Sequence, residues 1–236
     1  LSGNFSWYFC LPLTVQSILV SAGEFTMGFY DRYVMPRFIN CACATKPIMK
    51  QREKVVPRAS GTVLEIGIGT GLNLPYYDAS KVKRVIGLDP SKKSWDLAGE
   101  RAAQLAFPVE FIGLPSETIP LEDDSVDTVV VTFSLCTIPD PVTALRGMAR
   151  VLRPGGSLIF CEHGRAPDES VYRWQNRINP LWKRFAGGCH LNRDIPQLLI
   201  AGGFAVSDMQ ADYLPSTPRI AGYNFWGSAR PINSAS

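Results

Sequence analysis

Glycines and carboxylates gather at two places where an apolar stretch of the sequence ends, and their spacing suits a nucleotide-like ligand. The first place is Leu-Glu-Ile-Gly-Ile-Gly-Thr-Gly at 64–71, in which Glu65 precedes three glycines. Glycines let a chain turn tightly and bring bare backbone against a ligand. The second place is Gly-Leu-Asp-Pro-Ser at 87–91. Its Asp89 follows the glycines by about 20 residues, the region where an acid binds ribose hydroxyls. The alternative role for Asp89 is to cap the helix that follows it.

The spacing of the glycines argues against a nicotinamide-type site. Dinucleotide-binding turns follow Gly-x-Gly-x-x-Gly, whereas the order here is Glu-x-Gly-x-Gly-x-Gly. A carboxylate before the first glycine suits a cofactor that carries an amino acid group and a sulfonium cation and has no pyrophosphate. A nicotinamide-dependent oxidoreductase is therefore the disfavoured alternative.

Short apolar stretches alternate with helical stretches between 61 and 206, and they predict the framework that positions these residues. Nearly uniformly apolar strands indicate a parallel sheet buried on both faces, and right-handed crossovers make it doubly wound. The predicted strands are 61–67, 82–88, 109–112, 128–133, 157–161 and a late strand over 202–206. The helices predicted among them are 94–106, 141–152 and 195–201.

Further helices are predicted on either side of this alternation. Between 29 and 59 the chain forms a helical cover broken by three prolines. After the fifth strand, 168–194 forms an insertion that closes the acceptor site, with a helix break expected at Pro180. The predicted fold class is α/β: a Rossmann-like, doubly wound, mostly parallel sheet with an N-terminal helical cover and a helical insertion after strand five.

Four segments between about 55 and 207 carry a resemblance to a known family. They are VLEIGIGTGLNL (63–74), VIGLDPS (85–91), SETIPLEDDSVDTVV (116–130) and RVLRPGGSLIF (150–160). In these segments the chain resembles the class I S-adenosylmethionine-dependent methyltransferases, which implies S-adenosyl-L-methionine as the cofactor. By this resemblance the glycines admit the amino acid end of the cofactor, Glu65 orients their loop and Asp89 holds the ribose. The residues predicted to bind the cofactor are Glu65, Gly67, Gly69, Gly71, Asn73, Asp89, Pro90, Ser116, Glu117 and Phe133.

A closer resemblance lies in the C-terminal half. Its segments are VTFSLCTI (131–138), EH (162–163), WQ (174–175), GGCHLNRD (187–194) and AGGF (201–204). They look like those of the thiol S-methyltransferases of the methyltransferase-like group and their bacterial relatives, which implies a small, partly apolar acceptor such as a thiol. Quinone C-methyltransferases share the general outline, so a quinone precursor or a lipid is the alternative acceptor. The alternative of another class is a non-catalytic cofactor-binding or membrane-associated protein.

The acceptor side of the reaction needs few catalytic groups. Methyl transfer from a sulfonium is an in-line displacement, so the enzyme contributes mainly alignment and the exclusion of water. A thiolate needs little more, whereas a carbon or oxygen acceptor requires a general base. The chain has two histidines, and His163 lies at the exit of the fifth strand, so we predict it as the catalytic residue. The alternative is a structural histidine. Cys189 and His190 are adjacent ligands without partners, and no metal is predicted.

Composition limits the partners. A net charge of +3 is too small to argue for nucleic acid, and the six cysteines contain no C-x-x-C pair, as is usual in a reducing cytoplasm. We therefore predict a cytoplasmic protein whose partner is a small-molecule acceptor. Over 168–185, aromatic and apolar side chains recur near helical spacing beside several basic ones, which leaves a peripheral membrane contact as a second expectation. The oligomeric state stays open.

The first 26 residues form an apolar extension of uncertain status, and 27–236 form the predicted methyltransferase domain. The stretch 7–22 has no charge but is shorter than the roughly 20 residues that cross a bilayer. It also lacks the basic start of a signal peptide. A weak membrane-surface anchor, a buried helix and an extension outside the working protein remain three open interpretations.

Overall fold

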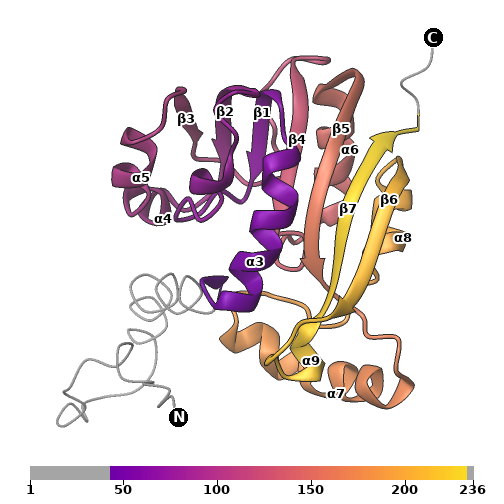
Figure 1. Ribbon diagram of the computed structural model, residues 1–236. Helices are drawn as coiled ribbons and strands as arrows, with labels where there is room; N and C mark the ends of the chain where they lie inside the picture. Colours follow the sequence, from indigo (N-terminus) through magenta and orange to yellow (C-terminus); the bar gives the residue numbers. More distant parts are fainter. Residues whose placement is uncertain (1–42, 233–236) are drawn as a thin grey trace, which may run out of the picture.

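A seven-stranded sheet forms the centre of the computed structural model, which describes residues 43–232 (Figure 1). Its strands are β1 (Gly61–Ile66), β2 (Val82–Leu88), β3 (Val109–Ile112), β4 (Val126–Thr132), β5 (Leu152–His163), β6 (Phe204–Tyr213) and β7 (Tyr223–Pro231). Their spatial order is β3-β2-β1-β4-β5-β7-β6. The strands from β3 to β5 are parallel, and β7 pairs antiparallel with both neighbours. The predicted doubly wound, mostly parallel sheet is confirmed.

Alternating side chains of β1 and β4 supply two cores, one on each face of the sheet. Leu64 and Ile66 belong to one core, whereas Val63 and Val130 belong to the other. Successive residues of a strand point to opposite faces, so both faces of these central strands are buried. This is why apolar residues fill most positions of these strands, and why the buried carboxylate of Glu65 stands out.

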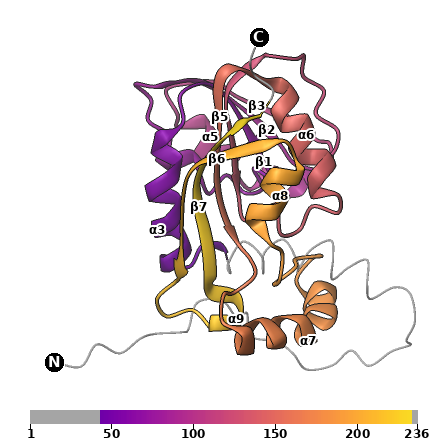
Figure 2. The ribbon, with the colours of Figure 1, turned by 90° about the vertical axis from the view of Figure 1, so that its right-hand side faces the viewer.

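Helices cover both faces of the sheet (Figure 2). They are α3 (Lys46–Val55), α4 (Lys92–Asp96), α5 (Gly99–Ala103), α6 (Pro141–Val151), α7 (Glu169–Phe185), α8 (Ile195–Ala201) and α9 (Arg219–Gly222). On one face α3 packs through Val55, and on the other α6 and α8 pack through Leu145 and Leu199. The described part of the predicted N-terminal cover is therefore α3. The apolar extension at 1–26 and the rest of the cover up to residue 42 lie outside the described residues.

Two helices differ from the expectations drawn from sequence. The single helix expected over 94–106 is divided into α4 and α5. The start of α4 is earlier than expected because the side chain of Ser91 accepts a hydrogen bond from the Ser94 amide and caps the helix there. The break expected at Pro180 was wrong, because α7 continues through it. Proline removes one amide donor, and the burial of the neighbouring Asn179 shows that tertiary packing holds this turn.

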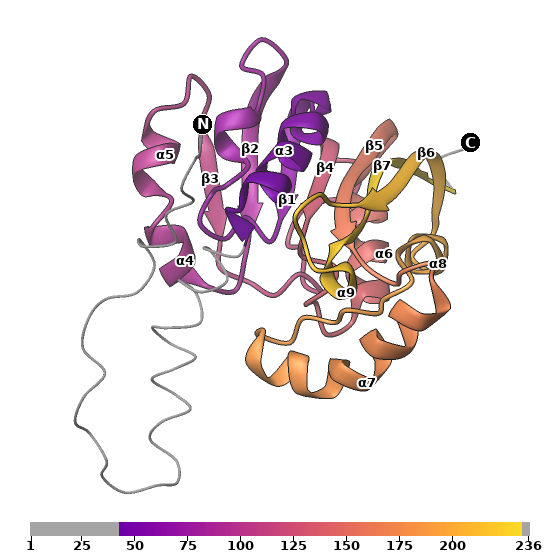
Figure 3. The same cartoon turned by 60° about the horizontal axis from the view of Figure 1, so that its bottom comes forward.

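A C-terminal hairpin extends the sheet beyond β5. The late strand expected from residue 202 is β6, but β7 was not predicted, and it inserts between β5 and β6. Figure 3 shows α7 and α9 side by side at the carboxyl edge of the parallel strands, where the insertion was expected to close the site. Among residues 43–232 the structure has no helix with the length and apolar character needed to span a bilayer.

Candidate active site

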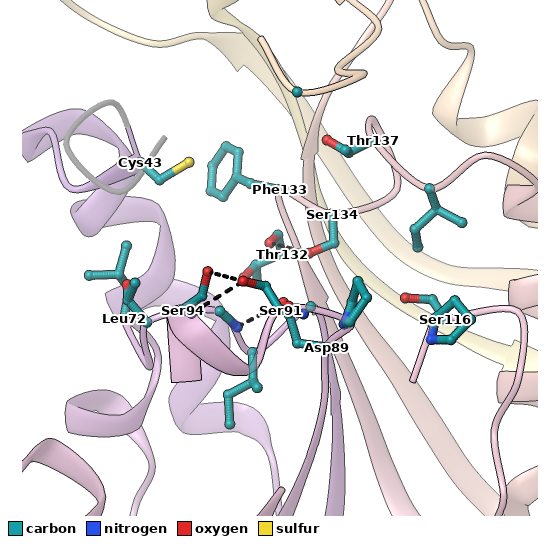
Figure 4. Close-up of a pocket in the computed structure, with 18 of the residues that line it drawn as sticks. Cys43, Leu72, Asp89, Ser91, Ser94, Ser116, Thr132, Phe133, Ser134 and Thr137 are labelled. Atoms are coloured by element: carbon teal, nitrogen blue, oxygen red, sulfur yellow. Dashed lines mark hydrogen bonds between the residues drawn. The ribbon is translucent and has the colours of Figure 1, made fainter. Parts of the chain in front are cut away.

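A cavity of about 760 Å³ opens at the carboxyl ends of β1, β2 and β4 (Figure 4). Its described lining comes from the loops after these strands, from the segment around Ser116, from Arg52 of α3 and Cys43 before it, and from Gly187 after α7. Ligands of doubly wound sheets bind at this edge, at the point where the strand order reverses. The volume also lies in the usual range for small-molecule and cofactor sites, about 300–1,000 Å³.

The loop after β1 needs its glycines for two different reasons. Gly67, Gly69 and Gly71 all have positive φ angles, of 69°, 50° and 71°. A Cβ at Gly67 would also overlap the Ser134 hydroxyl, whereas a Cβ at Gly69 would meet nothing closer than 3.8 Å. The first glycine is therefore required by packing against the loop after β4 as well as by its backbone conformation. At Gly69, open space above bare backbone leaves room for a ligand.

Asp89 is held in place by backbone amides on both of its carboxylate oxygens. The Gly69 amide donates to Oδ2 at 3.0 Å, and the Ser91 amide donates to Oδ1 at 2.7 Å. Burial raises the pKa of Asp89, and these two hydrogen bonds oppose that rise. Ser91, not Asp89, caps α4, so the capping alternative for Asp89 is wrong. The carboxylate lines the cavity, where its remaining lone pairs can accept hydroxyl donors.

Behind the glycine loop, a buried polar network connects Glu65 to Arg52. The carboxylate of Glu65 accepts from the Asn73 amide at 2.9 Å and from the Tyr77 hydroxyl at 2.7 Å. Asn73 in turn accepts from Arg52 at 2.7 Å, and Arg52 also donates to the Thr132 hydroxyl. Burial raises the pKa of Glu65 to about 7, although the hydrogen bonds and the Arg52 charge oppose the rise. The network therefore fixes Arg52 at the cavity wall.

The loop after β4 is organised by a second buried carboxylate, Glu162 at the end of β5. Its oxygens accept backbone amides of Ser134 at 2.6 Å, Leu135 at 2.9 Å and Cys136 at 3.4 Å. Burial raises the pKa of Glu162 to about 8. Phe133, at the start of this loop, has a φ of 53° and lies under the Arg52 guanidinium at 5.1 Å. The carboxylate thus holds a strained loop that forms one wall of the cavity.

Cys136, His163 and Cys189 converge next to this loop. The His163 Nε2 lies 3.1 Å from the Cys189 sulfur, and the three potential ligand atoms are all within 4.8 Å of one another. The Cys189 thiol and the charge of His163 hold the pKa of Cys136 well below its usual range. Burial alone would lower the pKa of His163, but the Cys136 thiolate outweighs it and raises the pKa.

Comparisons with known proteins place this arrangement in a family. Residues 64–160 match the model described as a methyltransferase domain. Over 178 residues the chain is 36% identical to thiol S-methyltransferase TMT1B of Homo sapiens, covering 70% of this chain and 71% of that protein. The chain belongs to the class I S-adenosylmethionine-dependent methyltransferases. The methyltransferase is also 31% identical to thiol S-methyltransferase TMT1A of Homo sapiens, over 71% of each chain.

The fold of the methyltransferase recurs in solved structures. A SAM-dependent methyltransferase from Methanosarcina mazei superposes with a TM-score of 0.58 at 22% identity, covering 72% of this chain and 92% of that one. This likeness concerns the fold alone. The family match identifies S-adenosylmethionine as the cofactor of the methyltransferase.

One unpaired donor tests whether the cavity fits that cofactor. The Nε of Arg52 is buried and has no hydrogen-bond partner among the described residues. A buried guanidinium with a free donor, at the wall beside the glycine loop, matches the carboxylate of the cofactor's amino acid end. Asp89 lies on the β2 side of the same cavity, where it matches the ribose hydroxyls. The residues present therefore fit S-adenosylmethionine.

The predicted site residues fall into three groups in the methyltransferase. Those lining the cavity are Gly67, Gly69, Asp89, Pro90, Ser116, Glu117 and Phe133. Glu65, Gly71 and Asn73 lie behind the described lining. His163 contacts Cys189 and is likewise not part of the described lining. Arg52 was missed, because nothing in its local sequence indicates that α3 places it at the cavity, against Asn73 and Thr132. Glu65 and Asn73 instead contribute through their hydrogen bonds, because Glu65 accepts from Asn73 and Asn73 accepts from Arg52, which lines the cavity.

Proposed function

We propose that the methyltransferase moves the methyl group to the thiol of a small, partly apolar acceptor. The observation that carries this proposal is the lack of a free base in the described lining of the cavity. Its two acids are both assigned to the cofactor, Asp89 to the ribose and Glu117 beside adenine, and they also accept backbone amides, Asp89 two and Glu117 that of Asp140 at 3.1 Å. Carbon and oxygen acceptors require a base, whereas a thiolate does not. The similarity to thiol S-methyltransferases supports the same acceptor.

The protein's own residues would act by binding and positioning. S-adenosylmethionine supplies an activated methyl group on its sulfonium. Asp89 would accept hydrogen bonds from the ribose, and Arg52 would donate to the carboxylate at the other end. Ser116 and Glu117 would flank adenine, and the apolar side chains of Phe133 and Ile138 would exclude water from the reacting atoms.

The test is transfer of a labelled methyl group to a panel of small thiols, phenols and quinone precursors. We expect transfer to thiols. Preferential methylation of a phenolic or quinone ring would overturn the thiol proposal and favour the alternative acceptor. Cofactor binding without transfer to any member of the panel would favour the non-catalytic alternative.

Two expectations about location remain predictions. The surface of α7 exposes Trp174, Leu181 and Phe185, each more than half accessible, near basic side chains of the same helix. This face suits the expected peripheral membrane contact, and vesicle co-sedimentation of the full chain would test it. The cytoplasmic location is tested by microscopy of the tagged protein.

A further inference from the structure

We propose that Cys136, His163 and Cys189 form a binding site for one zinc ion that leaves one coordination position open. The three side chains come from separate segments: the loop after β4, the end of β5 and the stretch between α7 and α8. His163 and Cys189 are 26 residues apart in sequence, so no local sequence motif indicates the site.

The ligand set and its geometry suit zinc. Thiolate and imidazole are its preferred ligands, and two cysteines with one histidine form a known catalytic set with an open fourth position. Tetrahedral coordination places ligand atoms about 3.5–3.8 Å apart. The three atoms here lie within 4.8 Å of one another. Small rotations of the side chains therefore enclose an ion.

The surroundings hold the ligands in position. Glu162 accepts the Cys136 amide, while Arg193 donates to the carbonyl oxygens of Leu135 and Ile138 on either side of that cysteine. The backbone amide of His190 donates to the Cys136 carbonyl at 2.8 Å. Such supporting hydrogen bonds orient the ligands in metal sites.

A buried ring nitrogen of the cluster has no partner in the described part of the chain, and an indole nitrogen lies beside one of its sulfurs. The His163 Nδ1 has no hydrogen-bond partner among the described residues. The indole nitrogen of Trp182 lies close to the Cys189 sulfur. The polar atoms of the cluster are thus not fully satisfied by one another. An indole N–H beside a thiolate sulfur is the kind of supporting donor expected around a metal-bound cysteine.

The structure removes the sequence-based argument against a metal. In the sequence the neighbour of Cys189 is His190, but the His190 ring approaches the Cys136 carbonyl oxygen at 3.1 Å. The histidine beside Cys189 is His163, which only the tertiary structure brings there.

The site lies against the acceptor side of the cavity. Thr137, next to Cys136, and Gly187, two residues before Cys189, both line the cavity. His163 and Cys189 are each partly exposed, and we place the acceptor thiol at the fourth position. A thiol that coordinates zinc loses its proton. This part of the inference rests on the proposed function and names how the acceptor is activated.

The transfer step then balances without a protein base. The acceptor thiol releases its proton to solvent as it coordinates. A lone pair of its sulfur forms the new bond to the methyl carbon while the bond from that carbon to the sulfonium breaks. The electron pair of the broken bond stays on the donor sulfur. The resulting thioether is a weaker ligand than the thiolate and leaves.

The first measurement is the metal content of the full chain, purified with a reductant and without chelators. We expect about one zinc per chain. After removal of zinc, added Co²⁺ should occupy the site and produce a thiolate-to-cobalt absorption band. Cys136→Ser and His163→Gln should lose zinc, whereas Cys161→Ser, which removes another buried cysteine of β5, should retain it. Circular dichroism and calorimetric binding of S-adenosylmethionine establish that each variant is folded.

The outcomes separate the zinc site from the proposed function. A native chain without zinc and without the cobalt band, or one in which Cys136 and Cys189 are joined in a disulfide in the presence of reductant, overturns the zinc site. Thiol methylation that persists after complete zinc removal overturns its role in activation and leaves the proposed function intact. Bound zinc with no thiol methylation upholds the site and overturns the proposed function.

Discussion

At the scale of single residues, the cofactor site depends on a few buried charges held by hydrogen bonds. Asp89 is fixed by amides from two loops, and Arg52 by Asn73 and Thr132. Because each charge is already oriented, binding does not have to restrain it. Substitution of one such residue should therefore change affinity more than it changes stability.

Replacing Asp89 with alanine should weaken S-adenosylmethionine binding by about 1.5–3 kcal/mol, the cost of losing a charged hydrogen-bond partner. Isothermal titration calorimetry measures the change. Asp96→Ala is the matched control, because Asp96 is exposed and pairs with Lys92 on the surface of α4. Unchanged affinity in a folded Asp89→Ala protein would contradict the ribose assignment.

The buried carboxyl of Glu65 should make stability depend on pH. Its pKa is about 7 in the folded protein, above the ordinary 4.5. The folded state therefore holds a proton that the unfolded state releases, and stability falls as pH rises from about 5 to about 7. Relative to Glu65→Gln, the native protein should lose up to about 3 kcal/mol over this range. Urea unfolding of both proteins at each pH gives the difference in their free energies of unfolding. If that difference does not change with pH, the raised pKa of Glu65 is refuted.

At the scale of elements, the loop after β1 and the insertion after β5 are held in place in different ways. The loop is shaped by positive φ angles and by contact with the loop after β4. The insertion is tied to the rest of the fold by side chains of α7 that satisfy buried backbone groups. Both elements should be sensitive to single substitutions at their points of attachment.

Gly67→Ala should destabilise the protein by about 2 kcal/mol or more, because it adds a strained backbone conformation and an overlap with Ser134. Gly99→Ala is the control. A Cβ there meets nothing within 4 Å, so its effect should be near zero or slightly stabilising. Chemical denaturation compares the two variants, and equal free energies of unfolding would show that the loop after β1 accommodates a Cβ at position 67.

Gln175→Leu should cost about 2–4 kcal/mol and loosen α7, because it leaves buried backbone groups without partners. The Gln175 side chain bonds the backbone of Ala166, Gly164, Leu191 and Ile220. Asn176→Ala, at an exposed position of the same helix, should cost little. Hydrogen exchange of α7 would locate the effect, and unchanged protection in Gln175→Leu would argue against this anchoring role.

At the scale of the whole molecule, the cavity joins segments from α3 to the stretch after α7. A ligand that binds only this assembled state stabilises the entire fold. At 100 times its dissociation constant, S-adenosylmethionine should add about 2.7 kcal/mol to the free energy of unfolding. Thermal denaturation measures this, with NADH as the control that should give no shift. A shift with NADH would revive the oxidoreductase alternative.

Local patterns in the sequence determined the framework of the methyltransferase. Apolar strands alternating with helices predicted the parallel sheet, and the glycines and Asp89 follow consecutive strands, so their meeting at one edge follows from topology. These features were predictable because each depends on residues close together in the chain.

Only the tertiary structure decided which distant residues meet. Arg52 reaches the cavity because α3 packs on one face of the sheet, and β7 joins β5 through backbone hydrogen bonds that require no particular side chains. Cys136, His163 and Cys189 converge from three segments. The energy of such contacts comes from packing across long sequence separations, and a single sequence carries no local trace of it.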